Sequence, residues 1–193
     1  MSVWDRISEI FINNEIIIAE DKELYSYGLQ QGILMILNVT TTIVIGIICG
    51  MVWQSIIFLL SYIPLRTYVG GYHAKTQWRC YIFSILIISV ALLGIKLIPW
   101  TNIIYFTLMF FAGSIISLLA PVEDGNKHLD SIEKTIYKKR SRVILSALCG
   151  IGTLLYIIGY PQISICILVA LLLLGIMLIL GNCKNKLRRL NYV

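Results

Sequence analysis

The residues with the clearest chemical potential are a histidine and a cysteine seven positions apart, His73 and Cys80. They belong to the polar segment 66–80, RTYVGGYHAKTQWRC, and Cys80 stands where a long apolar run begins. A cysteine thiol has a pKa near ~8.5, so a nucleophilic cysteine needs a neighbour that takes its proton or stabilises its anion. His73 could be that base, and Lys75 and Arg79 would add positive potential that favours the thiolate.

Helix geometry limits this pair. Residues seven apart share a face of a continuous helix, but their Cα atoms would be about 10.5 Å apart along the axis. We therefore expect His73 on a turn after Gly70 and Gly71, two residues that permit unusual backbone conformations, with the chain folded back toward Cys80. Near the N-terminal end of a helix, free N–H groups would favour the thiolate and are candidate oxyanion donors.

The sequence does not identify a third group that would orient His73. No Asp or Glu occurs between residues 24 and 122. A carboxylate would have to come from the N-terminal helix or from Glu123 and Asp124, and otherwise Gln77 or a backbone carbonyl would serve. The pair alone also fits a surface histidine and a helix-facing cysteine.

Composition sets the class of protein. The chain has 193 residues, of which 58% are hydrophobic and 13% charged, and its mean hydropathy is +0.84. A soluble domain is about 25% charged. Apolar runs near the length that crosses ~30 Å of hydrocarbon recur along the chain, and they are continuous rather than alternating as in a β-barrel. We therefore predict an all-α polytopic membrane protein.

The five cysteines form no CxxC pair and have no metal-ligand spacing, so we predict neither a metal nor a cofactor. The net charge of +6 reflects cations beside the apolar runs, which points to membrane topology rather than to nucleic acid. No cleavable signal peptide is predicted in the first 25 residues.

We expect a single membrane-embedded domain, residues 1–193. An amphipathic helix over residues 2 to about 22, within the segment 1–25, would lie at the membrane surface. About six membrane helices follow, and a basic loop at 121–142 and a basic tail at 182–193 complete the chain. The predicted membrane segments are 29–50, 51–65, 81–98, 103–120, 143–158 and 163–181.

The second of these segments is short. Its fifteen residues have Pro64 at their end and give roughly 22 Å of helix, so the segment either crosses a thinned membrane or re-enters. Counting it as a crossing places fifteen of the sixteen Lys and Arg residues on one side, with only Lys96 leaning to the other. The positive-inside rule then puts both termini and the segment 66–80 in the cytoplasm.

The segment 66–80 resembles the signature of the AgrB family, the accessory gene regulator B membrane peptidases. The signature combines an arginine, an aromatic residue, a Gly-Gly pair, a His-Ala-Lys and a cysteine seven after the histidine. The matching residues here are Arg66, Tyr68, Gly70, Gly71, His73, Ala74, Lys75 and Cys80. A second match is Ala120-Pro121-Val122, which closes a span and opens a charged loop with Asn126 and Lys127.

This resemblance implies a cysteine endopeptidase in the cell membrane of a Gram-positive bacterium, acting on an AgrD-like pro-peptide in quorum sensing. Cys80 would attack the bond before the precursor's C-terminal tail, and His73 would act as base and then protonate the leaving amine. An internal cysteine of the precursor would then close a thiolactone ring, or a hydroxyl a lactone. The family also implies a homodimer.

Other residues of the segment have more than one interpretation. The resemblance makes Arg66, Gly70, Gly71, Lys75 and Gln77 candidates to support the site or to bind substrate, but Arg66 could equally be a cation that sets topology. The cations of 127–142 and of the C-terminus would attract an acidic precursor tail, or else set topology and contact anionic lipid. His128 has no nearby cysteine and is interpreted as a solvated loop residue.

Two further classes of function remain open. The protein could export or transport a small peptide, although its predicted spans contain almost no ionisable residues to mark a pathway. It could also be a non-catalytic scaffold. Replacement of Cys80 and of His73 separates these classes from a protease.

Overall fold

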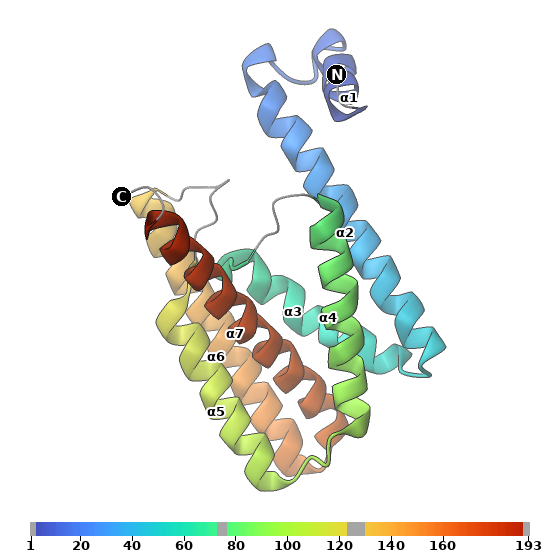
Figure 1. The fold of residues 1–193 in the computed structure, drawn as a ribbon, viewed down its shortest axis with the longest axis vertical. Helices are drawn as coiled ribbons and strands as arrows, with labels where there is room; N and C mark the ends of the chain where they lie inside the picture. Colours follow the sequence, from blue (N-terminus) through green and yellow to red (C-terminus); the bar gives the residue numbers. More distant parts are fainter. Residues whose placement is uncertain (1–2, 73–76, 123–129, 191–193) are drawn as a thin grey trace. The chain divides into compact units, whose positions relative to one another are not determined.

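The computed structural model describes residues 3–72, 77–122 and 130–190, and this part of the chain is almost entirely helical (Figure 1). It contains no β-strand, only one isolated parallel bridge between Gly70 and Val122. The predicted all-α fold class is therefore confirmed. The elements are α1 (Val3–Asn13), the 3-10 helix η1 (Ala19–Asp21), α2 (Lys22–Ile48), α3 (Val52–Val69), α4 (Gln77–Leu97), α5 (Asn102–Leu119), α6 (Ser131–Ile158) and α7 (Pro161–Leu190).

Four helices in the described residues are long and apolar enough to cross a membrane, and the candidate spans are Tyr25–Ile48, Asn102–Leu119, Ser131–Ile158 and Pro161–Leu187. They correspond to four of the six predicted membrane segments and fit a multi-pass membrane protein. The apolar part of α4, Tyr81–Leu97, is shorter. Whether α3 and α4 cross the bilayer stays a prediction.

The chain divides into two compact units, Met1–Thr41 and Thr42–Val193. The first contains α1, η1 and most of α2. Within it, the Lys22 ammonium is 2.7 Å from a Glu9 carboxylate oxygen, which ties the start of α2 to α1. The second unit contains the end of α2 and all of α3 to α7.

The N-terminal helix is shorter than the predicted helix over residues 2 to 22. It ends at Asn13 because the chain closes it with two hydrogen bonds, from Ile16 N to Phe11 O and from Glu15 N to Ile12 O, both 2.9 Å. Glu15 has a left-handed φ of 57°. This pattern is a Schellman motif, whose left-handed position usually holds glycine. Because the residue here is Glu15, the sequence does not predict the end of the helix.

The prediction that the second membrane segment ends at Pro64 is wrong. Pro64 lies inside α3, which continues to Val69. Proline removes only its own N–H bond to the carbonyl one turn earlier. That carbonyl belongs to Leu60, which is 69% exposed, so the interruption falls on the outer face of the helix.

The described parts of the predicted basic loop and basic tail are also largely helical. Helix α6 begins at Ser131 with a capping box, in which Asp130 and Glu133 each accept from the other's backbone. The cations from Lys134 to Arg142 therefore form the first turns of α6. In the same way α7 continues to Leu190, well beyond the predicted end of its apolar run, since Lys, Arg and Leu all favour helix.

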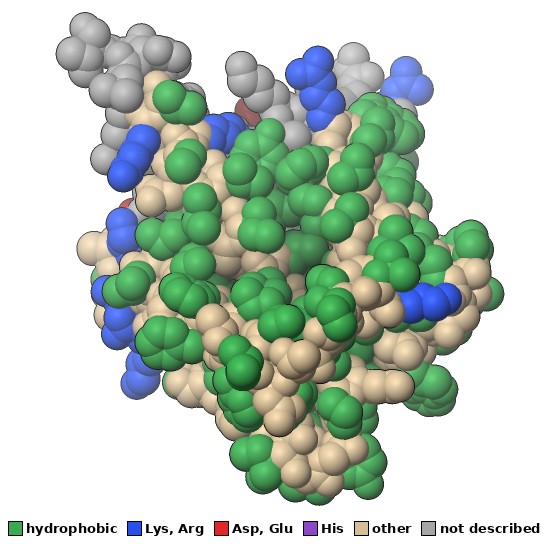
Figure 2. Space-filling view, turned by 60° about the horizontal axis from the view of Figure 1, so that its bottom comes forward, with side chains coloured by type: hydrophobic (Ala, Val, Ile, Leu, Met, Phe, Trp, Pro, Cys, Tyr) green, Lys and Arg blue, Asp and Glu red, His purple; other side chains and the backbone are tan. Residues whose placement is uncertain are grey.

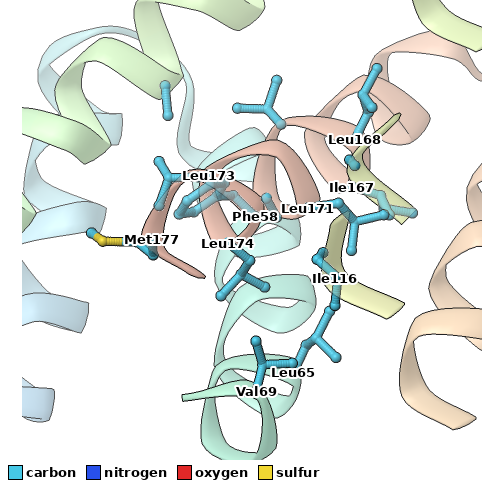
Figure 3. Close-up of a cluster of buried hydrophobic side chains, with 14 of the residues drawn as sticks. Phe58, Leu65, Val69, Ile116, Ile167, Leu168, Leu171, Leu173, Leu174 and Met177 are labelled. Carbon is cyan, nitrogen blue, oxygen red and sulfur yellow. The ribbon is translucent and has the colours of Figure 1, made fainter. Parts of the chain in front are cut away.

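Helix α7 is the centre of the second unit and packs against α3, α4, α5 and α6. Figure 3 shows its apolar side chains meeting those of α3 and α5. Phe58 and Leu65 of α3 and Leu168, Leu171 and Leu174 of α7 are fully buried. Of the four candidate spans in the described residues, the one in α7 contains the most apolar stretch, and it is also the one that the other helices enclose.

The outward faces are apolar as well, which suits contact with lipid. Ile103 and Leu118 of α5 are 81% and 82% exposed. Figure 2 shows hydrophobic side chains spread over the face in view, between other side chains and backbone, with Lys and Arg side chains mainly at its top and sides. A soluble protein rarely exposes so large an apolar surface.

Candidate active site

Helix α3 ends in a turn that requires glycine. Gly70 has φ 71° and ψ −143°, and Gly71 has φ 118°. Side chains with a Cβ rarely adopt these conformations. In addition, a Cβ at position 70 would collide with the carbonyl oxygen of Val122. The Gly-Gly pair of the sequence motif is thus explained by backbone conformation and by close packing.

The turn is joined to the segment that follows α5. Val122 N donates to Val69 O at 3.0 Å, and Gly71 N donates to Val122 O at 3.3 Å, so Gly70 and Val122 form the parallel bridge. The Ala120–Pro121 peptide bond just before is cis. The two motifs that the sequence showed separately, Gly70-Gly71 and Ala120-Pro121-Val122, are therefore in direct backbone contact.

Arg66 holds the same turn from the last part of α3. Its Nη1 donates to the carbonyl oxygen of Gly70, and its Nη2 donates to that of Tyr72 at 2.9 Å. A planar guanidinium can satisfy two acceptors at once, and charged donors make the stronger hydrogen bonds. Of the two interpretations of Arg66, support of the turn is the one for which its contacts give a physical basis.

Helix α7 forms the floor beneath the turn. Tyr72 N donates to the carbonyl oxygen of Met177 at 3.0 Å. A Cβ on Gly181, one helical turn further, would lie 2.8 Å from Tyr72 N and 2.9 Å from the carbonyl carbon of Gly71. The absence of a side chain at position 181 is what allows the backbones to come this close.

Aromatic contacts fix the flanks of the turn. The Tyr72 ring lies 5.5 Å from that of Phe83 on α4, and Lys184 Nζ of α7 lies 5.2 Å from the Tyr72 ring centre. Tyr68 packs edge-on against Tyr137 of α6 at 5.6 Å. Its hydroxyl accepts from Arg140 Nη1 at 3.0 Å, so three helices besides α3 hold the segment.

This geometry coincides with a match to a known family. The sequence profile described as Accessory gene regulator B, AgrB, matches residues 4–178. The chain belongs to the AgrB family. It is 27% identical over 153 residues to AgrB-like protein 2 of Clostridium perfringens strain 13, covering 73% of this chain and 70% of that protein. It is 28% identical over 141 residues to an AgrB-like protein of Listeria monocytogenes strain EGD-e, covering 70% and 69%.

No solved structure matches the chain. Membership of the AgrB family implies involvement in the processing of the peptide signal of the accessory gene regulator system, together with an AgrD-like peptide. The several apolar helices agree with the membrane setting of that process.

Of the predicted AgrB site residues, the structure brings together Arg66, Gly70 and Gly71. His73 and Lys75 lie outside the described residues, as do Glu123, Asp124 and the loop residues Asn126, Lys127 and His128. The backbone of Gln77 and Cys80 is described, and their side chains are not. Cys80 is in the first turn of α4, as expected for a helix N-terminus, and α3 does not continue beyond Val69.

Sequence reasoning missed the contribution of α7. Neither Met177 nor Gly181 stands near the motif in the chain, and a glycine in an apolar helix is an ordinary residue of membrane proteins. Tyr72 and Phe83 were also not singled out. One weak signal could have indicated Gly181. It lies where the apolar run gives way to polar residues, on the side of the membrane where the segment 66–80 is expected.

Proposed function

We propose that this member of the AgrB family is a membrane cysteine endopeptidase. It cleaves the C-terminal tail from an AgrD-like precursor and promotes cyclisation of the remaining peptide to a thiolactone or lactone autoinducer. Cys80 is the nucleophile and His73 the base. The proposal rests on the family match and on the packing of the segment that leads into His73 against the helix that carries Cys80.

The observation that carries the proposal is the contact between Tyr72 and Phe83. Tyr72 immediately precedes His73 in the chain, and Phe83 is three residues after Cys80 on α4. Positions three apart lie on neighbouring parts of one helix face. The contact therefore anchors the chain next to His73 on the part of α4 to which position 80 belongs, as a dyad would require.

The proposed reaction begins with transfer of the Cys80 proton to His73. The thiolate attacks the carbonyl carbon of the scissile bond, and the tetrahedral intermediate collapses by breaking the C–N bond. His73 returns the proton to the leaving amine. The N-terminal part of the precursor is then held on Cys80 as a thioester, and N–H groups of the first turn of α4 are the proposed oxyanion donors.

Cyclisation follows by exchange of this thioester. An internal cysteine of the precursor attacks the acyl carbon, the ring closes as a thiolactone, and the Cys80 thiol is released. Exchange of one thioester for another is close to isoenergetic, whereas a thiolactone made from a free carboxylate is uphill. The site must therefore exclude water and hold the precursor folded back.

The remaining site residues have supporting roles in this proposal. Arg66, Gly70 and Gly71 hold the turn, while Lys75 and Gln77 are proposed to bind the precursor or to assist the dyad. The cation distribution along the chain supports cytoplasmic termini and a cytoplasmic site, which is where a newly made precursor would arrive. A homodimer remains the expectation from the family.

Cleavage of a co-expressed precursor tests the proposal. Cys80→Ala and His73→Ala should each abolish release of the tail, while membrane insertion is unchanged. Cys49→Ala and His128→Ala are matched controls with the same substitutions outside the proposed dyad, and they should cleave normally. Cleavage that persists in both variants contradicts the protease assignment and favours the alternative, a transporter or exporter of a small peptide.

A further inference from the structure

The backbones of the Gly-Gly turn and of α7 approach each other more closely than side chains would allow. An added Cβ on Gly181 would lie 2.8 Å from Tyr72 N, 2.9 Å from Gly71 C and 3.1 Å from Gly71 Cα. All three atoms belong to the backbone, so the clash could not be relieved by rotation of a side chain. From the other side, a Cβ on Gly71 would lie 3.1 Å from Met177 O.

A hydrogen bond uses this close approach. Tyr72 N donates to Met177 O at 3.0 Å. A carbonyl oxygen has two lone pairs, so Met177 can accept this bond in addition to a bond within α7. Residues 177–181 of α7 thus contact the Tyr72 backbone directly and fix its distance from α7.

Side chains of two other helices contact the Tyr72 ring. Phe83 of α4 packs against it, and the ammonium of Lys184 of α7 lies 5.2 Å from its centre, within the range of a cation–π contact. Backbone and side chain of Tyr72 are therefore both fixed. The next residue in the chain is His73, so the position of Tyr72 sets where the chain departs toward it.

We propose that residues 177–181 of α7 are a positioning element for the proposed His73–Cys80 dyad, and that Gly181 is its determining residue. The inference rests on the proposed function, because it assigns Gly181 an effect on the reaction through Tyr72 and His73. In this proposal Gly181 takes no part in the bond changes and acts only through Tyr72. Its role is to let α7 and the Gly-Gly turn meet at backbone distance.

A methyl group at position 181 is the smallest change that separates the two backbones. It forces the turn and α7 apart and weakens the hydrogen bond from Tyr72 N to Met177 O. Misplacement of a catalytic group by about 1 Å can lower a rate on the order of 100-fold. Gly175 of the same helix is the matched control, because a Cβ there would lie 3.5 Å from Ile115 Cγ2, an ordinary contact.

The experiment compares Gly181→Ala with Gly175→Ala in the full-length protein in membranes. Cleavage of an AgrD-like precursor is measured as kcat and KM, and alkylation of Cys80 by iodoacetamide at pH 7 is measured by mass spectrometry. Cys183, an exposed thiol, serves as the reference. Gly181→Ala should lower kcat at least tenfold with KM within threefold, and should slow alkylation of Cys80 to the rate seen in His73→Ala.

Combination of Gly181→Ala with His73→Ala provides the decisive readout. If Gly181 acts by placing His73, Cys80 is alkylated no more slowly in the double variant than in His73→Ala alone. The positioning role is overturned if Cys80 in Gly181→Ala is alkylated as fast as in the wild type. It is also overturned if Gly181→Ala slows alkylation of Cys80 equally in the wild-type and the His73→Ala backgrounds. If Gly181→Ala is not recovered from membranes, Phe83→Leu replaces it. This substitution removes the Phe83 ring that packs against Tyr72, and the same results are expected.

The two proposals fail in different ways. Cleavage that persists in Cys80→Ala, or alkylation of Cys80 that is unchanged by His73→Ala, contradicts the dyad itself and with it the positioning role. A normal response to those two variants together with an inert Gly181→Ala contradicts the positioning role alone.

Discussion

Gly71 donates its backbone N–H to the carbonyl oxygen of Val122 at 3.3 Å, and this bond joins two segments that are remote in the sequence. One segment follows α3 and leads to His73, and the other follows α5. Both matched the AgrB signature, and their contact gives a physical reason for the pairing of the two motifs. The Val122 backbone contributes two of the hydrogen bonds that hold the turn after α3, one from Val122 N to Val69 O and one from Gly71 N to Val122 O.

The Gly70→Ala substitution tests this contact. The new Cβ would meet the Val122 carbonyl, and alanine would be forced into a conformation near φ 71°. Such backbone strain costs of order 1–3 kcal/mol, so the thermal midpoint in detergent and the cleavage rate should both fall. Gly150→Ala on α6, where no atom lies within 4 Å of the added Cβ, should leave both unchanged or raise the midpoint slightly. Equal midpoints for the two variants would contradict the described packing.

The Arg66→Lys substitution separates two roles of a cation. Lysine keeps the positive charge but cannot bond to Gly70 O and Tyr72 O with the geometry of a guanidinium. Loss of hydrogen bonds to a charged group is worth about 1.5–3 kcal/mol, or roughly 10- to 160-fold in rate if fully transmitted to the reaction. We therefore expect cleavage to fall at least tenfold, while the exposed control Arg142→Lys stays within twofold. Full activity of Arg66→Lys would instead show that only the charge matters, as in a topology signal.

The central place of α7 predicts an order of stability effects. Leu171 is fully buried in the second unit, whereas Leu118 of α5 is 82% exposed. In lipid, a leucine gains little from burial beyond its packing contacts, so Leu118→Ala should be nearly neutral. Leu171→Ala leaves a cavity and should lower the thermal midpoint clearly more than Leu118→Ala does. The reverse order would contradict the assignment of α7 as the core helix.

The sequence predicted the features that depend on composition and short-range pattern. It correctly predicted an all-α fold, four of the membrane segments, and a helix N-terminus at Cys80, since apolar runs and their polar borders are local signals. It also marked Gly70 and Gly71 as an unusual turn, because glycine pairs indicate special backbone conformations.

The errors arose where local signals conflict or where distant segments meet. Pro64 indicates a helix end, yet α3 tolerates it on an exposed face. The cations of 131–142 indicate a loop, yet they begin α6. Glu15 closes α1 in a position that usually holds glycine. The contacts of Val122 and Gly181 with the turn could not be predicted, because no short-range pattern encodes which backbones approach each other.

The most direct test of the central claim is detection of the acyl-enzyme. The wild-type protein is incubated in membranes with an AgrD-like precursor whose internal nucleophile is replaced by alanine, so that cyclisation cannot release the acyl group. Intact mass and peptide mapping should show a covalent adduct of the N-terminal precursor fragment on Cys80, removable by hydroxylamine and absent from Cys80→Ala. Cleavage of the precursor with no adduct on Cys80, or an adduct on another residue, would contradict the account.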